Sequence, residues 1–394
     1  MTDSLDTIVL GVGSLGSAAL MHLARRGQRV LGIEQFEIPH VRGSHHGQSR
    51  MLRAAYFEHA GYVPLVQRAV ELWRELNASP HGQIFYETGG IFLGMLEGEL
   101  IAGSITAATQ HDLPHTLLTA AAVRQRYPAL RPTDELVGFF DDGAGYILPE
   151  RAVQVMTDAA VEAGAQVRMN TRVHAWRADG RGVEVETSAG VFRAGTLVLT
   201  AGAWTAGLMA DLAADLAGDL AGGPAGRAKL PLRVSRQVLA WTRPKSVEAA
   251  GALATLPVWG IEAEDGVFSY GFPMFDAAAG FKSAIHRPGE TTDPELASRG
   301  PDAADEAEIR AQLARFIPGA DGPLVSMATC LYTNTPDGHF IIDRHPDYEQ
   351  VVMACGTSGH GFKFAPAIGE VLADLAQGAT PRVAIEFLRR GRFG

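Results

Sequence analysis

The apolar positions at the start of the chain change from a strand pattern to a helix pattern and back. Residues 7–10 and 30–33 are short apolar runs, and each predicts a buried strand. Between them, apolar residues recur at helical spacing through Ala18, Leu20 and Leu23. A strand, a helix and a second strand in this order predict the first unit of an α/β sheet.

Similar patterns continue along the chain and predict an α/β (α+β mixed) fold. The predicted helices cover 62–76, 150–164 and the segment from 361 to about 376. The predicted strands fall within 84–93, at 166–169, in an antiparallel unit at 172–200, in a strand-rich region at 230–290, and at 351–354.

These elements also predict two discontinuous domains, because the last third of the chain returns to the pattern of the first. We expect one domain that binds a dinucleotide and one that covers a substrate pocket with a sheet. The first would comprise residues 1–80, 145–225 and 320–394, and the second 81–144 and 226–319.

The turn between the first strand and helix carries the glycine pattern of a dinucleotide site. Gly11, Gly13 and Gly16 would allow a tight turn, close approach of a pyrophosphate, and close packing of helix on strand. Ser14 begins the helix, whose N-terminus attracts phosphate. Glu34, at the end of the second strand, is placed to accept hydrogen bonds from ribose hydroxyls.

This pattern alone does not separate NAD from FAD, but two later glycine-rich turns favour FAD. The buried strand at 196–199 leads to Gly202, and the strand at 351–354 leads to Gly356, Gly359 and Gly361. A second helix N-terminus would suit a flavin ring, which becomes anionic on reduction. The run 43–53 adds two histidines and two arginines, which suggests an anionic substrate held beside a redox ring.

Composition excludes several other classes of protein. The net charge of −10 argues against a nucleic-acid partner. The chain lacks an apolar stretch of roughly 20 residues and a basic leader, so we expect no membrane association and a cytoplasmic location. Two cysteines exclude a disulfide framework, and adjacent histidines without further ligands do not indicate a metal site. The repeated Ala-Asp-Leu pattern within 208–226 predicts an exposed insertion without an assigned function.

Four longer stretches resemble the monomeric sarcosine oxidase and N-methyltryptophan oxidase family, flavoproteins that oxidise secondary amines of N-methyl amino acids. The resemblance implies a FAD-binding, Rossmann-like domain of the glutathione-reductase type and a sheet-based substrate domain. The stretches are 43–56, 270–273 with Lys282 and His286, 330–337 with 340–343, and 358–364.

The resemblance also implies roles for individual residues. Cys330 would bond covalently to the flavin 8α-methyl group through a thioether, because a thiolate can attack this electron-poor position. Arg53 and Lys363 would clamp the substrate carboxylate, with Tyr332 beside it. Lys282 would stabilise the anion that forms when O2 takes electrons.

The remaining predicted residues would line the flavin and the amine pocket. Histidines there can bond the substrate or favour its neutral amine, which alone has a lone pair to release with hydride. His45, in contrast, is expected to serve only the backbone turn. The predicted catalytic residues are His46, Arg50, Tyr270 and His286, and the additional cofactor contacts are Ser44, Arg50, Val173, Phe362 and Lys363.

The predicted reaction is sarcosine + O2 + H2O to glycine, formaldehyde and H2O2, with FAD as cofactor and a monomer as the active form. Departures from the family pattern leave the substrate open. Gln48-Ser49 replaces Asp-Thr, and Ala54 stands where a histidine is common. N-methyltryptophan, pipecolate, proline or another secondary amino acid stay alternatives. So do a dehydrogenase that avoids oxygen and a flavin-binding electron-transfer subunit of a larger complex.

Overall fold

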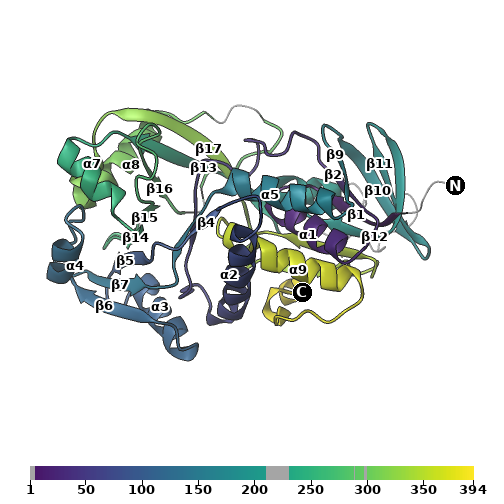
Figure 1. Cartoon of the computed structure of the whole chain (residues 1–394), viewed down its shortest axis with the longest axis horizontal. Coiled ribbons are helices and arrows are strands. Elements are labelled where there is room, and N and C mark those ends of the chain that lie inside the picture. The colour runs from purple at the N-terminus through teal and green to yellow at the C-terminus, as the bar shows by residue number, and fades with distance from the viewer. Residues whose placement is uncertain (1–4, 210–229, 288, 297–299) are drawn as a thin grey trace.

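Two large β-sheets lie toward opposite ends of the molecule in the computed structural model (Figure 1). The structure describes residues 5–209, 230–287, 289–296 and 300–394. The predicted insertion at 208–226 therefore lies outside the described residues, apart from Leu208 and Met209. Among the described helices, none is both long enough and apolar enough to cross a membrane.

The first sheet has a Rossmann-like parallel centre, which confirms the predicted fold class. Its strand order is β10 (Val173–Asp179), β11 (Gly182–Thr187), β12 (Gly190–Leu199), β1 (Leu5–Leu10), β2 (Val30–Ile33) and β9 (Gln166–Arg168), with β19 (Val351–Cys355) parallel to β12 and β18 (Ile341–Arg344) beside β19. The long strand β12 is antiparallel to β11 in its first half and parallel to β1 in its second. This change of partner carries the chain from the antiparallel unit into the parallel sheet.

Alternate residues of the parallel strands face two different layers. Val9, Val198 and Val352 pack under the helices α1 (Ser14–Arg25), α5 (Pro149–Glu162) and α9 (Ala365–Ala376). Their neighbours, such as Ile8 and Leu197, pack toward β10 and β11. Because successive side chains of a strand point to opposite faces, strands covered on both sides are apolar throughout. The short apolar runs in the sequence are explained by this burial.

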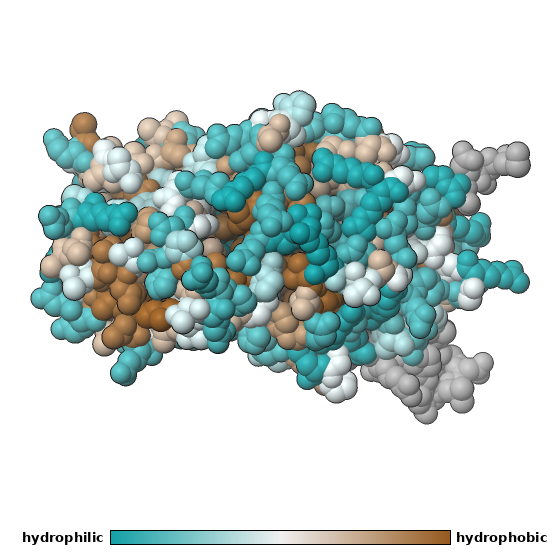
Figure 2. All heavy atoms as spheres, turned by 60° about the horizontal axis from the view of Figure 1, so that its bottom comes forward, coloured by the Kyte–Doolittle hydropathy of each residue, from teal (hydrophilic) through white to brown (hydrophobic). Residues whose placement is uncertain are grey.

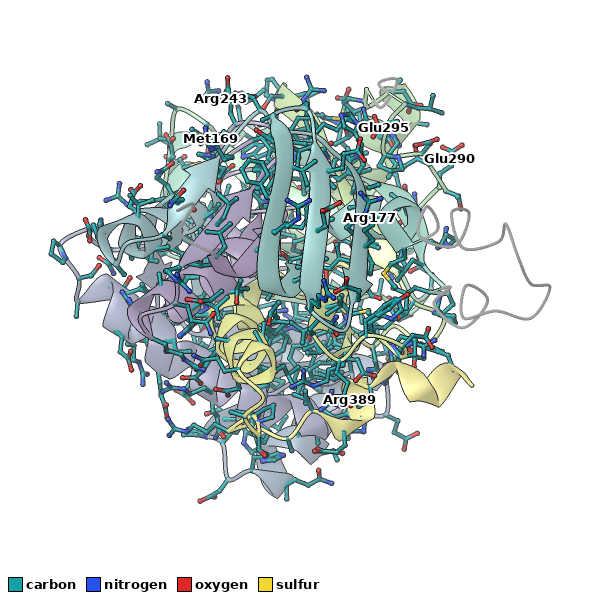
Figure 3. All side chains as sticks on the ribbon, turned by 90° about the vertical axis from the view of Figure 1, so that its right-hand side faces the viewer. Met169, Arg177, Arg243, Glu290, Glu295 and Arg389 are labelled. Atoms are coloured by element: carbon teal, nitrogen blue, oxygen red, sulfur yellow. The ribbon has the colours of Figure 1, made fainter. Side chains whose placement is uncertain are left out.

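The outer face of the antiparallel unit is polar. Arg177 on β10 stands opposite Glu184 on β11, and Glu184 also pairs with Arg193 on β12 (Figure 3). Exposed ion pairs of this kind contribute little stability, but charges on an outer strand discourage pairing with another chain.

The second sheet also has eight strands in the described part of the chain. Their order is β17 (Leu324–Asn334), β13 (Arg233–Thr242), β16 (Phe281–Ile285), β15 (Phe268–Gly271), β14 (Val258–Glu262), β5 (Gly90–Gly94), β7 (Val137–Asp141) and β6 (His115–Thr119). One face packs on α4 (Ala120–Arg126), α7 (Val247–Ala254) and α8 (Ala303–Phe316). The opposite face carries Trp241, Cys330 and Tyr332. The candidate site lies on this second face.

A small sheet and two helices complete the fold. The small sheet contains β3 (Arg50–Leu52), β8 (Gly145–Ile147) and β4 (Phe85–Tyr86), and the helices are α2 (Val63–Asn77) and α3 (Glu99–Gln110). The division into two domains stays a proposal, and one strand does not follow the predicted boundaries. Strand β17 lies within the range 320–394, yet it pairs with β13 and so belongs to the second sheet.

Most of the face shown in Figure 2 is hydrophilic, with apolar side chains in patches at the left and near the centre of the view. Exposed large apolar residues include Met95, Leu96 and Leu117, which belong to the loop after β5 and to β6. Apolar atoms are common on folded surfaces, so scattered residues of this kind need no special function.

Candidate active site

A cavity of about 590 Å³ opens over the turn between β1 and α1. Gly11 has a φ of +86°, and a Cβ there would lie 2.7 Å from the carbonyl oxygen of Thr200. A Cβ on Gly16 would lie 1.8 Å from the carbonyl oxygen of Gly11. Both positions therefore require glycine, and the N-terminus of α1 at Gly13 is brought to the cavity wall.

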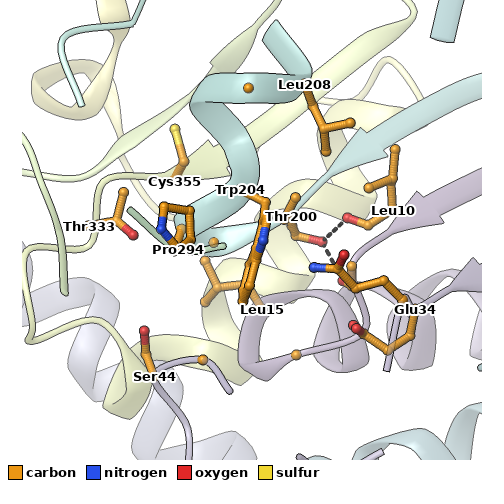
Figure 4. Close-up of a pocket in the computed structure, with 18 of the residues that line it drawn as sticks. Leu10, Leu15, Glu34, Ser44, Thr200, Trp204, Leu208, Pro294, Thr333 and Cys355 are labelled. Carbon is orange, nitrogen blue, oxygen red and sulfur yellow. Dashed lines mark hydrogen bonds between the residues drawn. The ribbon is translucent and has the colours of Figure 1, made fainter. Parts of the chain in front are cut away.

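Most of the predicted cofactor residues line this cavity, although they come from distant parts of the sequence (Figure 4). Gly16 does not line it and instead lets α1 pack on the turn. The residues that do are Gly11, Gly13, Ser14, Glu34, Ser44, Val173, Gly202, Gly356 and Gly361.

Glu34 is buried at the wall of this cavity. Its carboxylate accepts hydrogen bonds from the backbone N–H groups of Val12, at 2.9 Å, and Phe36, at 3.0 Å. Burial raises the pKa of Glu34, while these two hydrogen bonds oppose the shift. The carboxylate is thereby fixed in orientation, and its remaining lone pairs can accept from a ligand's hydroxyl groups.

Several other residues line this cavity without having been predicted to do so, among them His40, His45, Trp204 and Glu295. His45 packs against Gly13, its Nε2 atom has no hydrogen-bond partner in the structure, and its ring lies 4.7 Å from that of His40. Trp204 donates a hydrogen bond of 2.9 Å to Glu295, and both line the cavity opening. His45 was expected to serve only the turn, whereas its unpartnered nitrogen stands beside a predicted phosphate site.

A second, smaller cavity of about 90 Å³ adjoins the first. Ser14, Ser44, Thr357 and Gly361 line both cavities, so they form a common wall. The first cavity has the glycine turn, helix end and buried carboxylate that suit the ADP half of FAD, and a ring bound to it can reach the second. The residues present therefore fit the predicted cofactor. The predicted residues around the second cavity are Ser44, Arg50, Arg53, Tyr270, His286, Cys330, Tyr332, Gly359, Phe362 and Lys363.

Cys330 and the aromatic residues come from the inner face of the second sheet. The Cys330 thiol is buried, and burial raises its pKa, while Arg50 and Lys282 act in the opposite direction. His286 Nδ1 lies 3.2 Å from the hydroxyl oxygen of Tyr332. Burial lowers the pKa of His286 to about 4, so its imidazole is neutral at pH 7 and can accept or donate one hydrogen bond.

Arg53 forms an ion pair that the sequence did not reveal. Its Nη2 lies 2.6 Å from Oε1 of Glu58, and both side chains are largely buried. Burial alone would raise the pKa of Glu58, but the combined attraction of Arg53, His360 and Lys363, with the hydrogen bond from Arg53, outweighs it and brings the pKa to about 2. Nη1 of Arg53 is buried and has no partner in the structure, so one donor stays available to a ligand.

Lys363 lies beside this pair and is also buried. Its Nζ donates a hydrogen bond of 2.9 Å to the carbonyl oxygen of His360. Burial and the nearby Arg53 lower the pKa of Lys363 to about 7, although Glu58 opposes the shift. The charge of Lys363 therefore responds to a change of pH near neutrality, or to an anionic ligand.

Lys282 and His46 lie behind the wall of the second cavity and line neither cavity. The Lys282 ammonium donates to Gly47 O at 2.6 Å, Ser49 O at 2.8 Å and Ser49 Oγ at 3.1 Å. Burial and Arg50 lower the pKa of Lys282, yet three acceptors match the three donors of a charged ammonium. Burial, assisted by Arg50, also lowers the pKa of His46 to about 4, which leaves its imidazole neutral.

No group of three or more His, Cys, Asp or Glu side chains in the described residues could hold a metal ion. The chemistry available to the site is thus that of two cavities with a common wall, one suited to a dinucleotide and one to a small anion. Buried cations, aromatic rings and a thiol surround the second.

Three comparisons with known proteins agree with this geometry. The family model described as FAD dependent oxidoreductase matches residues 6–375. A monomeric sarcosine oxidase of Streptomyces avermitilis is 38% identical over 95% of this chain and 94% of its own length. An N-methyl-L-tryptophan oxidase of Citrobacter koseri is 35% identical over 98% and 99%. The solved structure of NikD, an amino acid oxidase, superposes with a TM-score of 0.81 at 24% identity over 98% of both chains, which shows the same fold.

Proposed function

The chain belongs to the FAD-dependent oxidoreductase family and is a flavoprotein amine oxidase, and we propose that its substrate is sarcosine. The observation that carries this proposal is the second cavity, which gathers Arg53, Lys363, Tyr332 and Cys330 beside the dinucleotide cavity. A buried cluster of cations suits a carboxylate, and aromatic rings suit the methylated amine.

The size of the second cavity favours a small substrate. Its volume of about 90 Å³ is far below that of ordinary ligand pockets, which span roughly 300–1,000 Å³. The rings of Phe268 and Tyr270, whose centroids lie within 6.5 Å of that of His286, form part of its wall together with the His286 ring. The indole ring of N-methyltryptophan would have to displace some of these side chains. Sarcosine would not, because it has only a methylene and a methyl carbon besides its carboxylate and its nitrogen.

The carboxylate of the substrate would bind Lys363 and Nη1 of Arg53. An anion there favours the charged form of Lys363, whose pKa lies near 7 in the structure. The hydrogen bond from Arg53 to Glu58 would keep the guanidinium oriented during binding. With the carboxylate fixed, the amine and its methyl group would extend toward Cys330 and the common wall, where the flavin ring would lie.

The neutral histidines would act on the amine. His286 lies 3.2 Å from the Tyr332 hydroxyl, and its neutral imidazole would accept a hydrogen bond from the substrate nitrogen without adding a positive charge beside it. FAD, when bound, would accept two electrons from the amine, and these electrons would then reduce O2 to H2O2. The released imine then takes up water and yields glycine and formaldehyde, so atoms and electrons balance.

Lys282 would serve the oxygen step. A cation buried near Cys330 stabilises negative charge that develops when O2 is reduced. Its contacts to Gly47 and Ser49 fix the ammonium in place, so little reorganisation is needed at that moment. Cys330 would hold the flavin covalently, because Cys330 lines the second cavity and the other cysteine, Cys355, does not.

The test is product formation in air. The purified protein with sarcosine should release formaldehyde, glycine and H2O2 in equal amounts, and faster than N-methyltryptophan or pipecolate gives its products. Faster turnover of N-methyltryptophan would overturn the assignment of sarcosine. Bound FAD without turnover of any secondary amino acid would instead favour an electron-transfer subunit. We also propose that the active form is a monomer, which light scattering of the same preparation tests.

A further inference from the structure

The loop that holds Lys282 is itself held from its other side by Glu150. This residue is in the first turn of α5, which packs on the dinucleotide sheet and not on the sheet that carries Lys282. Oε1 of Glu150 accepts hydrogen bonds from the backbone N–H groups of Gly47, at 2.6 Å, and Gln48, at 3.1 Å. A single carboxylate oxygen thus ties two successive amides of the loop.

Those amides point the same way because the loop has an unusual backbone. Gly47 has a φ of +95° and Gln48 a φ of +71°, so two successive residues are left-handed. For Gln48, which has a Cβ, this conformation carries a cost that the surroundings must offset. Glycine suits position 47, because a residue with a Cβ would be strained at this φ and its Cβ would also lie 2.5 Å from Cδ1 of Leu239. The side chain of Gln48 is held in turn, because its Oε1 accepts from the indole N–H of Trp241 at 3.0 Å.

The carbonyl side of the same loop faces the lysine. Gly47 and Ser49 supply three acceptors to the Lys282 ammonium, and the Ser49 amide donates to the Gly47 carbonyl at 2.9 Å. The peptide groups of 47–49 therefore lie between a carboxylate and an ammonium. Hydrogen bonds aligned in this way reinforce one another, since each polarises the next.

We propose that Glu150 is a positioning residue for the oxygen reaction, which fixes the 47–49 loop and through it the ammonium of Lys282. The inference rests on the proposed role of Lys282 and not on the identity of the amine. Arg50, Cys330, His46 and Glu150 are the charged or titratable groups around Lys282. Glu150 is the one carboxylate among them, so it also compensates the positive charge of the cluster.

The test separates the oxygen reaction from the amine reaction. The FAD-loaded protein is reduced by light in the presence of EDTA, without any amine, and is then mixed with O2. Glu150→Ala should slow reoxidation by about tenfold or more, and Glu150→Gln, whose amide oxygen can still accept from both N–H groups, should restore most of the rate. Glu162→Ala, at the other end of α5, is the matched control and should reoxidise as the wild type does.

A double-mutant cycle shows whether Glu150 acts through Lys282. In a Lys282→Met background, Glu150→Ala should change reoxidation by less than about twofold, because the group that it positions is gone. Equal slowing in both backgrounds would overturn the proposal. An unchanged reoxidation rate in Glu150→Ala would also overturn it. The same holds if Glu150→Ala slows flavin reduction by substrate and reoxidation by O2 by the same factor.

Hydrogen exchange measures the geometry without any turnover. The amides of Gly47 and Gln48 should exchange at least about tenfold faster in Glu150→Ala than in the wild type, and Glu150→Gln should stay close to the wild type. Unchanged protection of both amides in Glu150→Ala would contradict the proposed contact. If Lys282→Met reoxidises at the wild-type rate, the role of Lys282 fails and this inference fails with it. If sarcosine does not reduce the flavin but the cycle behaves as described, only the substrate proposal fails.

Discussion

Arg53 and Glu58 form a buried ion pair, with Nη2 and Oε1 2.6 Å apart, at the cavity where the substrate carboxylate would bind. Arg53 also lies over the rings of Tyr56 and Phe57, at 4.9 and 4.3 Å from their centroids. The guanidinium is therefore held by its own chain before any ligand arrives. Glu58 partly neutralises the charge that the ligand would meet, so it sets how strongly the site attracts anions.

Removal of the Glu58 charge should strengthen anion binding and weaken the fold. In Glu58→Gln, Arg53 faces the cavity without its counter-ion, so a carboxylate should bind about tenfold more tightly at a pH low enough to keep Lys363 charged. Leaving one member of a buried pair uncompensated should lower the free energy of unfolding by roughly 3–5 kcal/mol. Titration with methoxyacetate, an ether analogue of sarcosine, and urea unfolding measure the two effects.

The exposed Glu71 offers a matched control for this experiment. Glu71→Gln removes the same charge from α2, where it pairs with Arg68 at the surface. Neither anion affinity nor stability should change by more than about 0.5 kcal/mol. Weaker methoxyacetate binding in Glu58→Gln would show that Glu58 organises Arg53 for the ligand more than it competes with the ligand.

Binding of carboxylates should weaken as the pH rises above 7. The pKa of Lys363 is about 7, so the side chain is charged below this pH and neutral above it. A bound anion raises that pKa, and the dissociation constant of methoxyacetate should therefore be constant at low pH and increase up to about tenfold per pH unit above 7. Lys363→Met should bind more weakly and lose this pH dependence. Binding that stays independent of pH between 6 and 9 in the wild type would contradict a lysine with a lowered pKa.

The flavin should stay attached to the denatured protein through Cys330. Mass spectrometry of the unfolded wild-type chain should show the added mass of FAD, and Cys330→Ser should show the chain alone. Cys355→Ser is the control, since Cys355 lines the dinucleotide cavity and not the second cavity. Release of intact FAD from the denatured wild type would show that the cofactor is held without a covalent bond.

Gly16 should not tolerate even a methyl group. A Cβ there would lie 1.8 Å from the carbonyl oxygen of Gly11, so Gly16→Ala must separate α1 from the turn that holds the dinucleotide. We expect a loss of about 3 kcal/mol or more in stability together with loss of FAD binding. At Gly180 a Cβ would meet nothing within 4 Å, and Gly180→Ala should change stability by less than about 0.5 kcal/mol. Wild-type FAD affinity in Gly16→Ala would contradict the close packing seen here.

The elements that could be predicted well from the sequence are those whose structure depends on the residues of the element itself. Strand β2 begins and ends at the predicted residues, because all four of its residues, three with apolar side chains and one glycine, are buried. The glycine turn was recognisable since its conformation depends on glycine itself. Helix α9 begins later than expected, at Ala365, because residues Phe362–Phe364 form a separate 3₁₀ turn before it.

The contacts that the sequence could not reveal join residues that no periodic pattern relates. Glu58 looks like a surface carboxylate in the sequence, and Glu150 looks like an ordinary first-turn helix residue. Glu58 lies five positions after Arg53, a spacing that neither a helix nor a strand pattern predicts as a contact, and Glu150 lies 103 positions after Gly47. The pairing of β17 with β13 is equally non-local, since about ninety residues separate their starts. The site residues on β17, such as Cys330, could be named only from the family resemblance, and their position relative to the cavities could be known only from the structure.

We propose that this protein oxidises sarcosine through bound FAD. Anaerobic mixing of the purified protein with sarcosine, followed in the visible absorption band of the flavin, tests it most directly. We expect rapid bleaching by sarcosine, slower bleaching by N-methyltryptophan and pipecolate, and recovery of the band when air is admitted. A flavin band that sarcosine leaves unchanged would contradict the claim.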